Sequence, residues 1–242
     1  MPLKQLNRML ALLSEEKQME FRKRIDEKQV YLSTYYSQHK MKFPNQLSPE
    51  LCYVIGLLLG DGTISGGGSN GYRCWRVELL FDNADHSYIY EHIFQRIFEL
   101  NLRRYPQKGC TNVCCNSFIA HWFFRSFFGL HQGRKADKIE MPVRILKTAD
   151  FTLINSCIRG LFDSDGCFAP SDASVRYAST SKKMVDQVSS LLESQGVKGK
   201  RYQWLKDPKY KMLYDIRYRG HHSLRSFSAL VGFWHPLKDK KL

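Results

Sequence analysis

Two stretches of the chain repeat one pattern of small, apolar and acidic residues, YVIGLLLGDGTI at positions 53–64 and FTLINSCIRGLFDSDGCF at positions 151–168. Apolar residues recur in both at spacings of three and four, which predicts a helix in each. Small residues four positions apart lie on one face of a helix and let a second helix approach closely. These residues are Gly56 and Gly60 in the first stretch, and Gly160 and Ser164 in the second. We therefore expect the four positions to form a helix–helix interface.

Each predicted helix ends on an acid followed by glycine, Asp61-Gly62 in the first stretch and Asp165-Gly166 in the second. The carboxyl end of a helix carries the negative pole of its dipole, so an acid there is unfavourable unless a cation binds. The alternative is that these acids, together with Asp163, are solvated residues before a glycine stop. Because the acid recurs after 104 positions, the pattern favours a bound cation.

A second pair of matching segments lies at nearly the same interval. Gly129-Leu130-His131 with Lys135 matches Gly232-Phe233-Trp234-His235 with Lys238, and these two lysines are 103 positions apart. Self-similarity at a domain-sized interval indicates a duplicated domain. The predicted fold is α+β, with two pseudo-symmetric αββαββα halves at 47–142 and 143–242. An extension at 1–46, with helices predicted over 3–13 and 19–36, precedes them; its function is not readable from the sequence.

The composition indicates which cellular compartment the protein occupies. Of 242 residues 43% are hydrophobic, which is enough to bury a core, and no run reaches the ~18–20 apolar residues that cross a bilayer. Seven cysteines, odd in number and irregularly spaced, indicate reduced thiols in an intracellular protein. Cys110, Cys114 and Cys115 are the one cluster to weigh as a metal site. They lack a second pair at zinc spacing, so a buried strand is favoured.

A net charge of +14 and a pI near 9.5 indicate a polyanionic partner. Charge alone suits DNA, RNA or an anionic membrane surface equally. Arginine and glutamine on predicted strands can read guanine and adenine edges in the major groove, although many such residues hold phosphates instead. The candidates for DNA contact are Arg73, Arg76, Arg201, Gln203, Lys211, Arg217 and Arg219.

The segments VIGLLLGDG (54–62) and IRGLFDSDG (158–166) closely resemble the two signature helices of LAGLIDADG homing endonucleases in their single-chain form. The resemblance runs from about Ser48 to the C-terminus. The first segment departs at its sixth position, where Leu59 replaces the usual acid, whereas the eighth-position acid is present in both. The resemblance implies that the signature helices pack at a pseudo-two-fold axis and that two saddle-shaped sheets straddle duplex DNA.

Carboxylates at adjacent helix tips match the needs of metal-assisted phosphodiester hydrolysis. We therefore expect Asp61 and Asp165 to be catalytic and to bind Mg²⁺, or Mn²⁺ in its place, one acid for each strand cut. The backbone carbonyl of Gly60 or Ser164 would add a ligand. Asp163 is expected to cap or orient rather than to bind metal, because the other copy has Leu59 there.

The resemblance also implies a lysine near each acid, just before an Ile-Pro-like turn. Lys138 is the expected residue in the first half and Lys238 in the second, with Lys240 and Lys241 as competitors. The alternative is that these lysines are solvated or contact phosphates. Asp82 occupies a position that the family often fills with a polar residue near the active site. His131 and His235 match across the repeat and invite a general-base role, although a packed histidine near a helix end is the commoner one.

The expected function is a site-specific, Mg²⁺-dependent endonuclease that cuts double-stranded DNA as a monomer. The family implies a long asymmetric target and products with short 3′ overhangs. One alternative is a maturase that binds its own intron RNA, and another is a catalytically silent DNA-binding regulator on the same fold. Retention of both acids favours the nuclease, because a silent relative has no need of two carboxylates at one helix–helix tip.

Overall fold

The computed structural model describes residues 14, 31–33, 40–67, 74–205 and 207–242. Most of the predicted helical extension at 1–46 lies outside these ranges. Its described part contains two short strands, β1 (Tyr31–Leu32) and β2 (Met41–Lys42), which pair antiparallel. Residues 31–32 are therefore extended where the sequence predicts a helix over 19–36, because pairing with β2 satisfies the backbone instead.

The two halves contain the same succession of elements. The elements of the first half are α3 (Pro49–Leu59), β3 (Thr63–Gly67), β4 (Cys74–Phe81), α4 (Ala84–Phe98), β5 (Arg103–Gln107), β6 (Cys110–Asn116), α5 (Phe118–Trp122) and the π-helix η1 (Phe123–Phe127). The elements of the second half are α6 (Val143–Leu146), α7 (Phe151–Asp165), β7 (Gly166–Ala169), the 3₁₀-helix η2 (Pro170–Asp172), β8 (Ser174–Ser179), α8 (Lys182–Glu193), β9 (Lys200–Trp204), β10 (Leu213–Arg219), α9 (His221–Leu230) and α10 (Pro236–Asp239). Apart from the short helices, each half reads helix, two strands, helix, two strands, helix.

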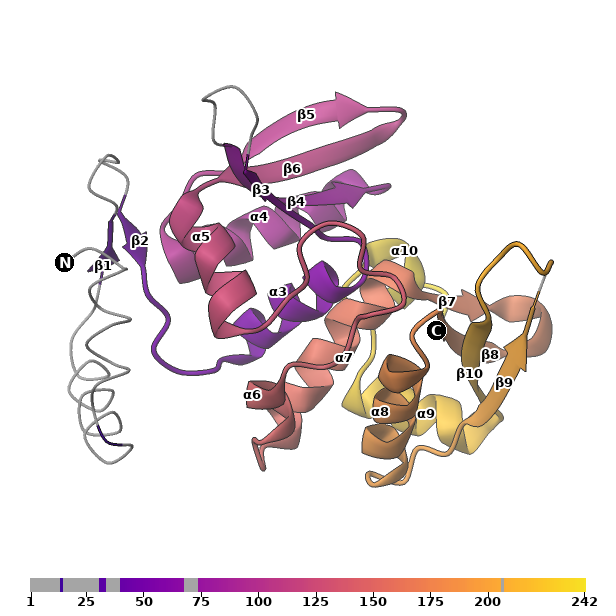
Figure 1. Ribbon diagram of the computed structural model, residues 1–242. Coiled ribbons are helices and arrows are strands. Elements are labelled where there is room, and N and C mark those ends of the chain that lie inside the picture. Colours follow the sequence, from indigo (N-terminus) through magenta and orange to yellow (C-terminus); the bar gives the residue numbers. More distant parts are fainter. Residues whose placement is uncertain (1–13, 15–30, 34–39, 68–73, 206) are drawn as a thin grey trace.

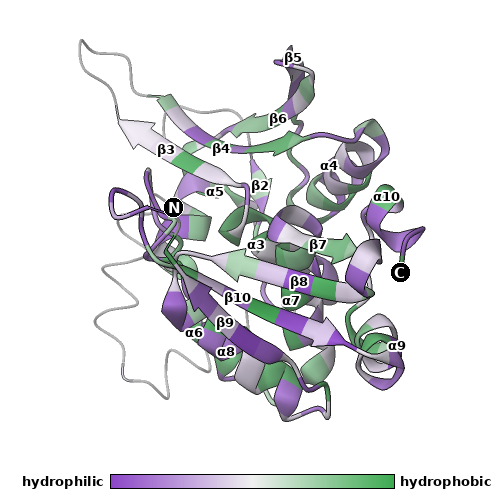
Figure 2. Cartoon of the chain, turned by 90° about the vertical axis from the view of Figure 1, so that its right-hand side faces the viewer, coloured by the Kyte–Doolittle hydropathy of each residue, from purple (hydrophilic) through white to green (hydrophobic). Residues whose placement is uncertain are grey.

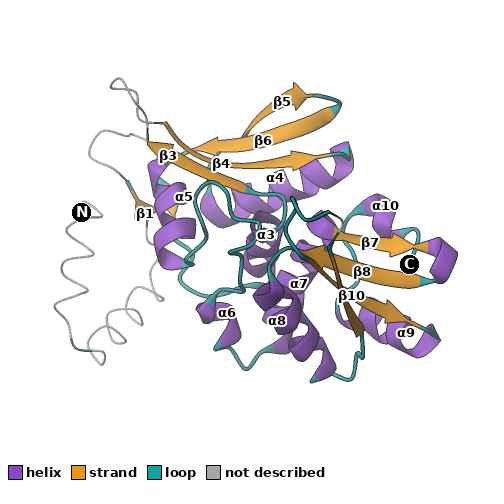
Figure 3. Cartoon of the chain, turned by 45° about the vertical axis from the view of Figure 1, so that its right-hand side comes forward, coloured by secondary structure: helices purple, strands orange, loops and turns teal. Residues whose placement is uncertain are grey.

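Each half folds its strands into one antiparallel sheet, in the orders β3-β4-β6-β5 and β7-β8-β10-β9. Equal strand order in the two sheets is what a duplicated domain predicts. The helices α3 and α7 lie side by side between the two sheets (Figures 1 and 3). The predicted α+β fold is confirmed.

Small residues bring α3 and α7 into close contact. A Cβ atom added to Gly56 would lie 2.0 Å from the carbonyl oxygen of Cys157, and one added to Gly160 would lie 2.1 Å from a backbone oxygen of α3. One added to Gly60 would lie 1.9 Å from Oγ of Ser164. Because backbone atoms cannot move aside as a side chain can, a larger residue would force the helices apart. All four small positions of the repeat therefore lie in this helix contact.

The strands alternate between an apolar face, packed on helices, and a polar face on the opposite side. In β4 the buried residues are Val77, Leu79 and Phe81, and in β10 Ile216 and Tyr218 point to the helices. We call the opposite face of each sheet its open face. Figure 2 shows hydrophilic residues along β9 and β10 of the second sheet. Within the described part of the chain, no helix is long and apolar enough to cross a membrane.

Candidate active site

The acids of the two repeated segments meet at the tips of α3 and α7. Gly60 is the C-cap of α3, so Asp61 follows it directly, and Asp165 is the last residue of α7. Their carboxyl groups lie close enough to act directly on each other, and both residues reach the protein surface. The fold thus joins two acids that are 104 positions apart.

Partial loss of hydration raises the pKa of both carboxyl groups. The protein around Asp165, and then the charge of Asp61, raise the pKa of Asp165 to about 6, although Lys135 and Lys238 oppose the shift. Burial likewise raises the pKa of Asp61, against the charges of Lys238 and Lys135. Two ionised carboxylates in such close contact repel each other, and a cation between them would relieve that repulsion.

One lysine lies at each of these helix ends. The ammonium nitrogen of Lys135 lies 2.5 Å from the carbonyl oxygen of Leu58, near the end of α3. That of Lys238 lies 2.6–3.1 Å from the carbonyl oxygens of residues 162–164, in the last turn of α7. Burial lowers the pKa of Lys135 to about 8 and also lowers the pKa of Lys238, while nearby acids oppose both shifts. Each ammonium group thus meets the negative pole of a helix.

The sequence predicts Lys138 at the first of these positions, and the structure places Lys135 there instead. Lys138 is exposed, on a turn in which its N–H lies 2.7 Å from the carbonyl oxygen of Lys135. Lys138 lies one residue further from the following proline than the family spacing suggests. The repeat itself identifies Lys135, since Lys135 and Lys238 are 103 positions apart. Lys240 and Lys241, the competitors of Lys238, are exposed.

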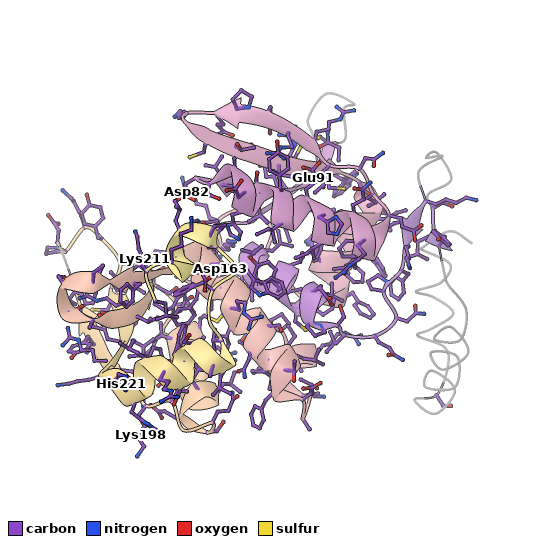
Figure 4. All side chains as sticks on the ribbon, turned by 180° about the vertical axis from the view of Figure 1, so that it is seen from behind. Asp82, Glu91, Asp163, Lys198, Lys211 and His221 are labelled. Carbon is purple, nitrogen blue, oxygen red and sulfur yellow. The ribbon has the colours of Figure 1, made fainter. Side chains whose placement is uncertain are left out.

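A cavity of about 430 Å³ opens beside Asp61, on the side of Lys238. Asp82 lies in its wall, with Oδ1 at 3.1 Å from Nε2 of His235. The other polar lining residues are Thr63, Glu78, His86, Gln107, Cys110, Asn112, Asp163 and Ser164. Figure 4 shows Asp82 and Asp163 near the junction of the two halves. The structure therefore brings Asp82 close to the acid pair, as the family position of this residue implies.

His131 and His235 do not occupy equivalent places. His131 is exposed, whereas His235 is buried and hydrogen-bonded to Asp82. At the interval that relates the two site lysines, the counterpart of His235 is Gln132. Gln132 donates to the carbonyl oxygen of Gly66 at 2.7 Å. A one-residue shift in the alignment of the two copies explains the false match, and His131 is not at the site.

Among the described residues, no group of three or more histidine, cysteine, aspartate or glutamate side chains is placed to hold a metal ion. The free thiols of Cys110, Cys114 and Cys115 lie on β6, which agrees with the strand reading. A cation at the acid pair would therefore need further oxygens from backbone, water or substrate, as Mg²⁺ commonly does. The carbonyl of Ser164 already accepts a hydrogen bond from Lys238 at 3.1 Å.

Strand register places Arg217 and Arg219 of β10 on the open face of the second sheet. The alternate residues of β10 are buried against helices. Arg217 pairs across the sheet with Arg176 on β8 and with Lys200 on β9, so these two also belong to the open face. The sequence patterns did not reveal Arg176 and Lys200, because which residues face one another depends on strand pairing.

Other predicted DNA-contacting residues are oriented differently. Arg201 and Gln203 lie on the helix-facing side of β9, where Arg201 donates to Asp186 of α8 at 3.1 Å. Lys211 precedes β10 and forms an ion pair with Asp137 at 2.7 Å. The alternation of β9 thus turns two of the predicted residues away from the open face.

The first sheet offers one of the predicted arginines. Arg76 lies on its open face, with Nε at 3.3 Å from Oδ1 of Asn116 and Nη1 at 3.6 Å from Glu78. Arg73 lies outside the described residues. An arginine already paired with neighbours is held in place and can still face a ligand.

Solved structures with this fold include the homing endonuclease I-DmoI. Its complex with DNA and Mn superposes with a TM-score of 0.60 and 14% identity, covering 77% of this chain and 97% of that one. Its complex with DNA and Ca gives a TM-score of 0.56, also at 14% identity, covering 76% and 90%. These matches establish a common fold.

Two much longer proteins of Methanocaldococcus jannaschii are similar in sequence. They are a glutamine–fructose-6-phosphate aminotransferase (isomerizing), 24% identical over 224 residues, and a probable translation initiation factor IF-2, 24% identical over 218 residues. The matches cover 88% and 85% of this chain, but 19% and 17% of the two proteins. This chain thus spans about a fifth of the length of these relatives. Residues 152–232 match the family described as LAGLIDADG-like domain. Residues 152–232 are therefore similar to a LAGLIDADG-like domain, and most of the chain shares the fold of I-DmoI.

Proposed function

We propose that the chain is a site-specific endonuclease that cuts both strands of a DNA duplex with the help of a divalent cation. The observation that carries this proposal is the adjacent pair of Asp61 and Asp165 at the tips of α3 and α7, with a lysine ammonium group at each tip. Hydrolysis of a phosphodiester needs a water nucleophile and neutralisation of the charge on phosphate and leaving oxygen. Acids and ammonium groups gathered at one point can serve both needs.

The donor set at the tips fits Mg²⁺, with Mn²⁺ as a substitute, because such cations prefer carboxylate, carbonyl and water oxygens. Asp61 and Asp165 would hold the cation. Of the two expected carbonyl ligands we assign Gly60, because Lys238 occupies the carbonyl of Ser164. A proton bound to either acid must be lost before the pair accepts a cation. A bound divalent cation supplies an activated water and neutralises charge on the phosphate.

In this proposal Lys135 and Lys238 neutralise charge on the phosphate and orient the attacking water molecule. Each holds its ammonium group at a helix end and close to the acid pair. From there it can bind a phosphate oxygen or orient a water molecule. With a pKa of about 8, the amine of Lys135 can gain and lose a proton near neutral pH. The proposed catalytic residues are thus Asp61, Asp165, Lys135 and Lys238.

The net charge of +14 and the cationic side chains on the open faces of the two sheets favour duplex DNA as the partner. The outward side chains of Arg76, Arg176, Lys200, Arg217 and Arg219 can hold phosphates or read guanine. Because the two halves differ in sequence, the proposed target is asymmetric and long enough to reach both sheets. One chain supplies both acids, so we propose a monomer. Short 3′ overhangs are the products that the family implies.

The relatives support this proposal in two ways. The homing endonuclease I-DmoI binds DNA in complexes that contain Mn or Ca, which supports a DNA substrate and a divalent ion. The two Methanocaldococcus proteins carry unrelated names, yet both contain a segment like this chain. A segment shared by proteins with unrelated names is what insertion of an intein would produce.

The aromatic residues of β9 favour a second candidate, an RNA-binding intron maturase. The Arg217 guanidinium lies 4.6 Å from the ring centroid of Tyr202, and Trp204 is 39% exposed. Aromatic rings beside cationic groups stack on unpaired bases, which RNA offers more often than duplex DNA. A catalytically silent DNA-binding regulator is a further alternative, and the paired acids oppose it.

The decisive experiment is incubation of the protein with a randomised duplex library and Mg²⁺, followed by sequencing of the cut ends. We expect one asymmetric target with short 3′ overhangs, no cutting in EDTA, and binding with little cutting in Ca²⁺. The matched control is Asp61→Asn/Asp165→Asn protein, which should bind the recovered target and leave it intact.

Competition separates the nuclease from the maturase. Folded intron RNA and the recovered duplex are offered at equal concentration to the non-cutting double variant. The nuclease should hold its cognate duplex ~10³-fold or more above random duplex at fixed salt. If RNA displaces the duplex and neither Mg²⁺ nor Mn²⁺ supports cutting by the wild type, the nuclease proposal is wrong.

A further inference from the structure

The sixth position of the signature helix differs between the two halves. In the first half it is the apolar Leu59, and in the second it is Asp163, whose exposed fraction is 2%. The carboxylate oxygen Oδ2 of Asp163 accepts hydrogen bonds from the hydroxyl of Tyr53 at 2.8 Å and from the N–H of Trp234 at 3.0 Å. One buried acid therefore joins α3, α7 and the segment that leads into α10.

The contacts continue from Asp163 through a chain of buried side chains. The hydroxyl of Tyr53 also lies 2.7 Å from Nε2 of His86 on α4. The ring of His86 packs on that of His235, with 4.6 Å between the ring centroids, and His235 is bonded to Asp82. Asp82 is the exposed end of this chain of contacts, whereas the other four residues are buried. We call these five residues, Asp163, Tyr53, His86, His235 and Asp82, the polar network. Three of these residues belong to the first half and two to the second. Their contacts therefore hold the segment before α10 against both halves.

Lys238 follows closely after the segment that these contacts hold in place. Trp234 donates its backbone N–H to Asp163 and lies two residues before the start of α10, and Lys238 is four residues further on. Its ammonium group is consequently held against the carbonyl oxygens of residues 162–164. In the first half, Leu59 stands at the position that corresponds to Asp163. An apolar side chain cannot accept a hydrogen bond from backbone N–H groups, so Leu59 cannot hold the segment that carries Lys135 in the same way.

Each lysine associates with a different acid of the catalytic pair. Lys238 and Asp61 line the same cavity, and Lys238 is the cation that acts most strongly on Asp61. Lys135 is the cation that acts most strongly on Asp165. We therefore pair Asp61 with Lys238, which shares its cavity, and assign Lys135 to Asp165 by charge interaction alone.

We propose that Asp163 is a positioning residue that fixes Lys238 beside Asp61, so that the two cleavage centres of the chain are unequal. Its consequence for strand cutting rests on the proposed nuclease function, whereas its effect on Lys238 does not. Asp163 touches no reacting atom in this proposal; it acts through the backbone N–H of Trp234. Loss of its carboxylate should release Lys238 and leave Lys135 in place.

The first test needs no cleavage. Wild type, Asp163→Asn and Asp163→Leu are trace-acetylated, and the ratio of Lys238 to Lys135 modification is read by mass spectrometry of chymotryptic peptides. We expect the ratio to rise several-fold in Asp163→Leu and less in Asp163→Asn, because asparagine keeps an acceptor oxygen. Leu59→Met, a volume-conserving change at the matching position, is the control and should leave the ratio unchanged. An unchanged ratio in folded Asp163→Leu overturns the proposal. If the leucine variant fails to fold, an unchanged ratio in Asp163→Asn overturns it.

The second test follows the two strands separately. A supercoiled plasmid that carries the recovered target is cut under single-turnover conditions, and end-labelled strands give one rate constant for each. Misplacement of a supporting residue commonly costs about 10–100-fold in activity, so Asp163→Leu should accumulate nicked plasmid in which one strand is cut and the other is slowed by that factor. Equal slowing of both strands would indicate a merely structural role and overturns the unequal-centre part. Absence of cutting by wild type would count against the nuclease function alone, and the acetylation ratio would still decide on Asp163.

Discussion

The ammonium nitrogen of Lys135 lies 2.5 Å from the carbonyl oxygen of Leu58, at the end of α3 that carries Asp61. Its pKa falls to about 8 because the surrounding protein removes water from it, even though Asp165 and Asp61 act in the opposite direction. Lys138, one turn further along the chain, is exposed. The two lysines therefore form a natural pair of test and control.

Replacing Lys135 with methionine should slow cutting of one strand strongly, by ~10²-fold, because a buried cation at the reacting phosphate is lost. Lys138→Met should change neither strand. The measurement is the rate of nicking and of linearisation of a target plasmid. If Lys138→Met were the slower enzyme, the placement of Lys135 in the site would be wrong.

Asp61→Asn and Asp165→Asn should each abolish double-strand cutting while leaving DNA affinity largely intact. Each change removes one carboxylate from the pair that would hold the cation, and asparagine keeps nearly the same shape. Gel shift of the target duplex in Ca²⁺, together with cutting in Mg²⁺, checks both halves of the expectation. Full cutting by either single variant would remove that residue from the active site.

The raised pKa of Asp165 gives a stability prediction in the absence of divalent ions. Its ordinary pKa is 3.8 and its folded value is about 6, so the folded state binds the proton more tightly than the unfolded state. As pH rises through about 6, the proton is lost and the folded state becomes less stable relative to the unfolded one. At pH 7.5 Asp165→Asn should therefore melt a few degrees above wild type, and the difference should shrink toward pH 4.5.

Melting curves of both proteins across this pH range, recorded in EDTA, decide the matter. Adding Mg²⁺ at pH 7.5 should raise the melting temperature of wild type more than that of Asp165→Asn, because a cation that binds the folded state stabilises it. A wild type that is the more stable protein at pH 7.5 in EDTA would contradict the raised pKa.

Gly56→Leu should destabilise the fold and reduce cutting together. A side chain at Gly56 meets the backbone of α7 at Cys157, so the two helices must separate and their tips move apart. Overpacking typically costs ~1–3 kcal/mol, and the absence of any flexible neighbour at this position places the change at the upper end. Thermal melting and a cleavage assay measure the two effects. Thr152→Leu, an exposed position of α7, is the matched control and should alter neither.

Strand register predicts that Arg217 matters more for DNA than Arg201. Each arginine is bonded to an acid, Arg217 to Asp215 and Arg201 to Asp186, but Arg217 lies on the open face and Arg201 on the opposite side of its strand. If Arg217 contacts a phosphate, Arg217→Ala should lower affinity and reduce the slope of log affinity against log salt by ~0.9. Arg201→Ala should leave that slope unchanged. Anisotropy titrations of a labelled duplex at several salt concentrations test this, and equal losses would argue against the assigned face.

Local spacing in the sequence was sufficient to predict the duplicated helices. Gly56, Gly60, Gly160 and Ser164 reveal a close helix contact because residues four apart share a helix face wherever that helix lies. The acids Asp61 and Asp165 follow from the same registration, since they stand at equal places in the two copies. The α+β order of each half likewise follows from alternation and periodicity, which are properties of a few consecutive residues.

Tertiary structure decided the rest, because those features depend on the path of loops and on which strands pair. Lys135 rather than Lys138 reaches the end of α3 through the course of the turn that connects the halves. Arg201 turns to the helices, and Lys200 beside it faces outward, through the register of β9 on β10. Asp163, Tyr53 and His86 become neighbours only when α3, α4 and α7 pack, although up to 110 positions separate them. No local pattern encodes a contact whose partners are chosen by the folding of three separate helices.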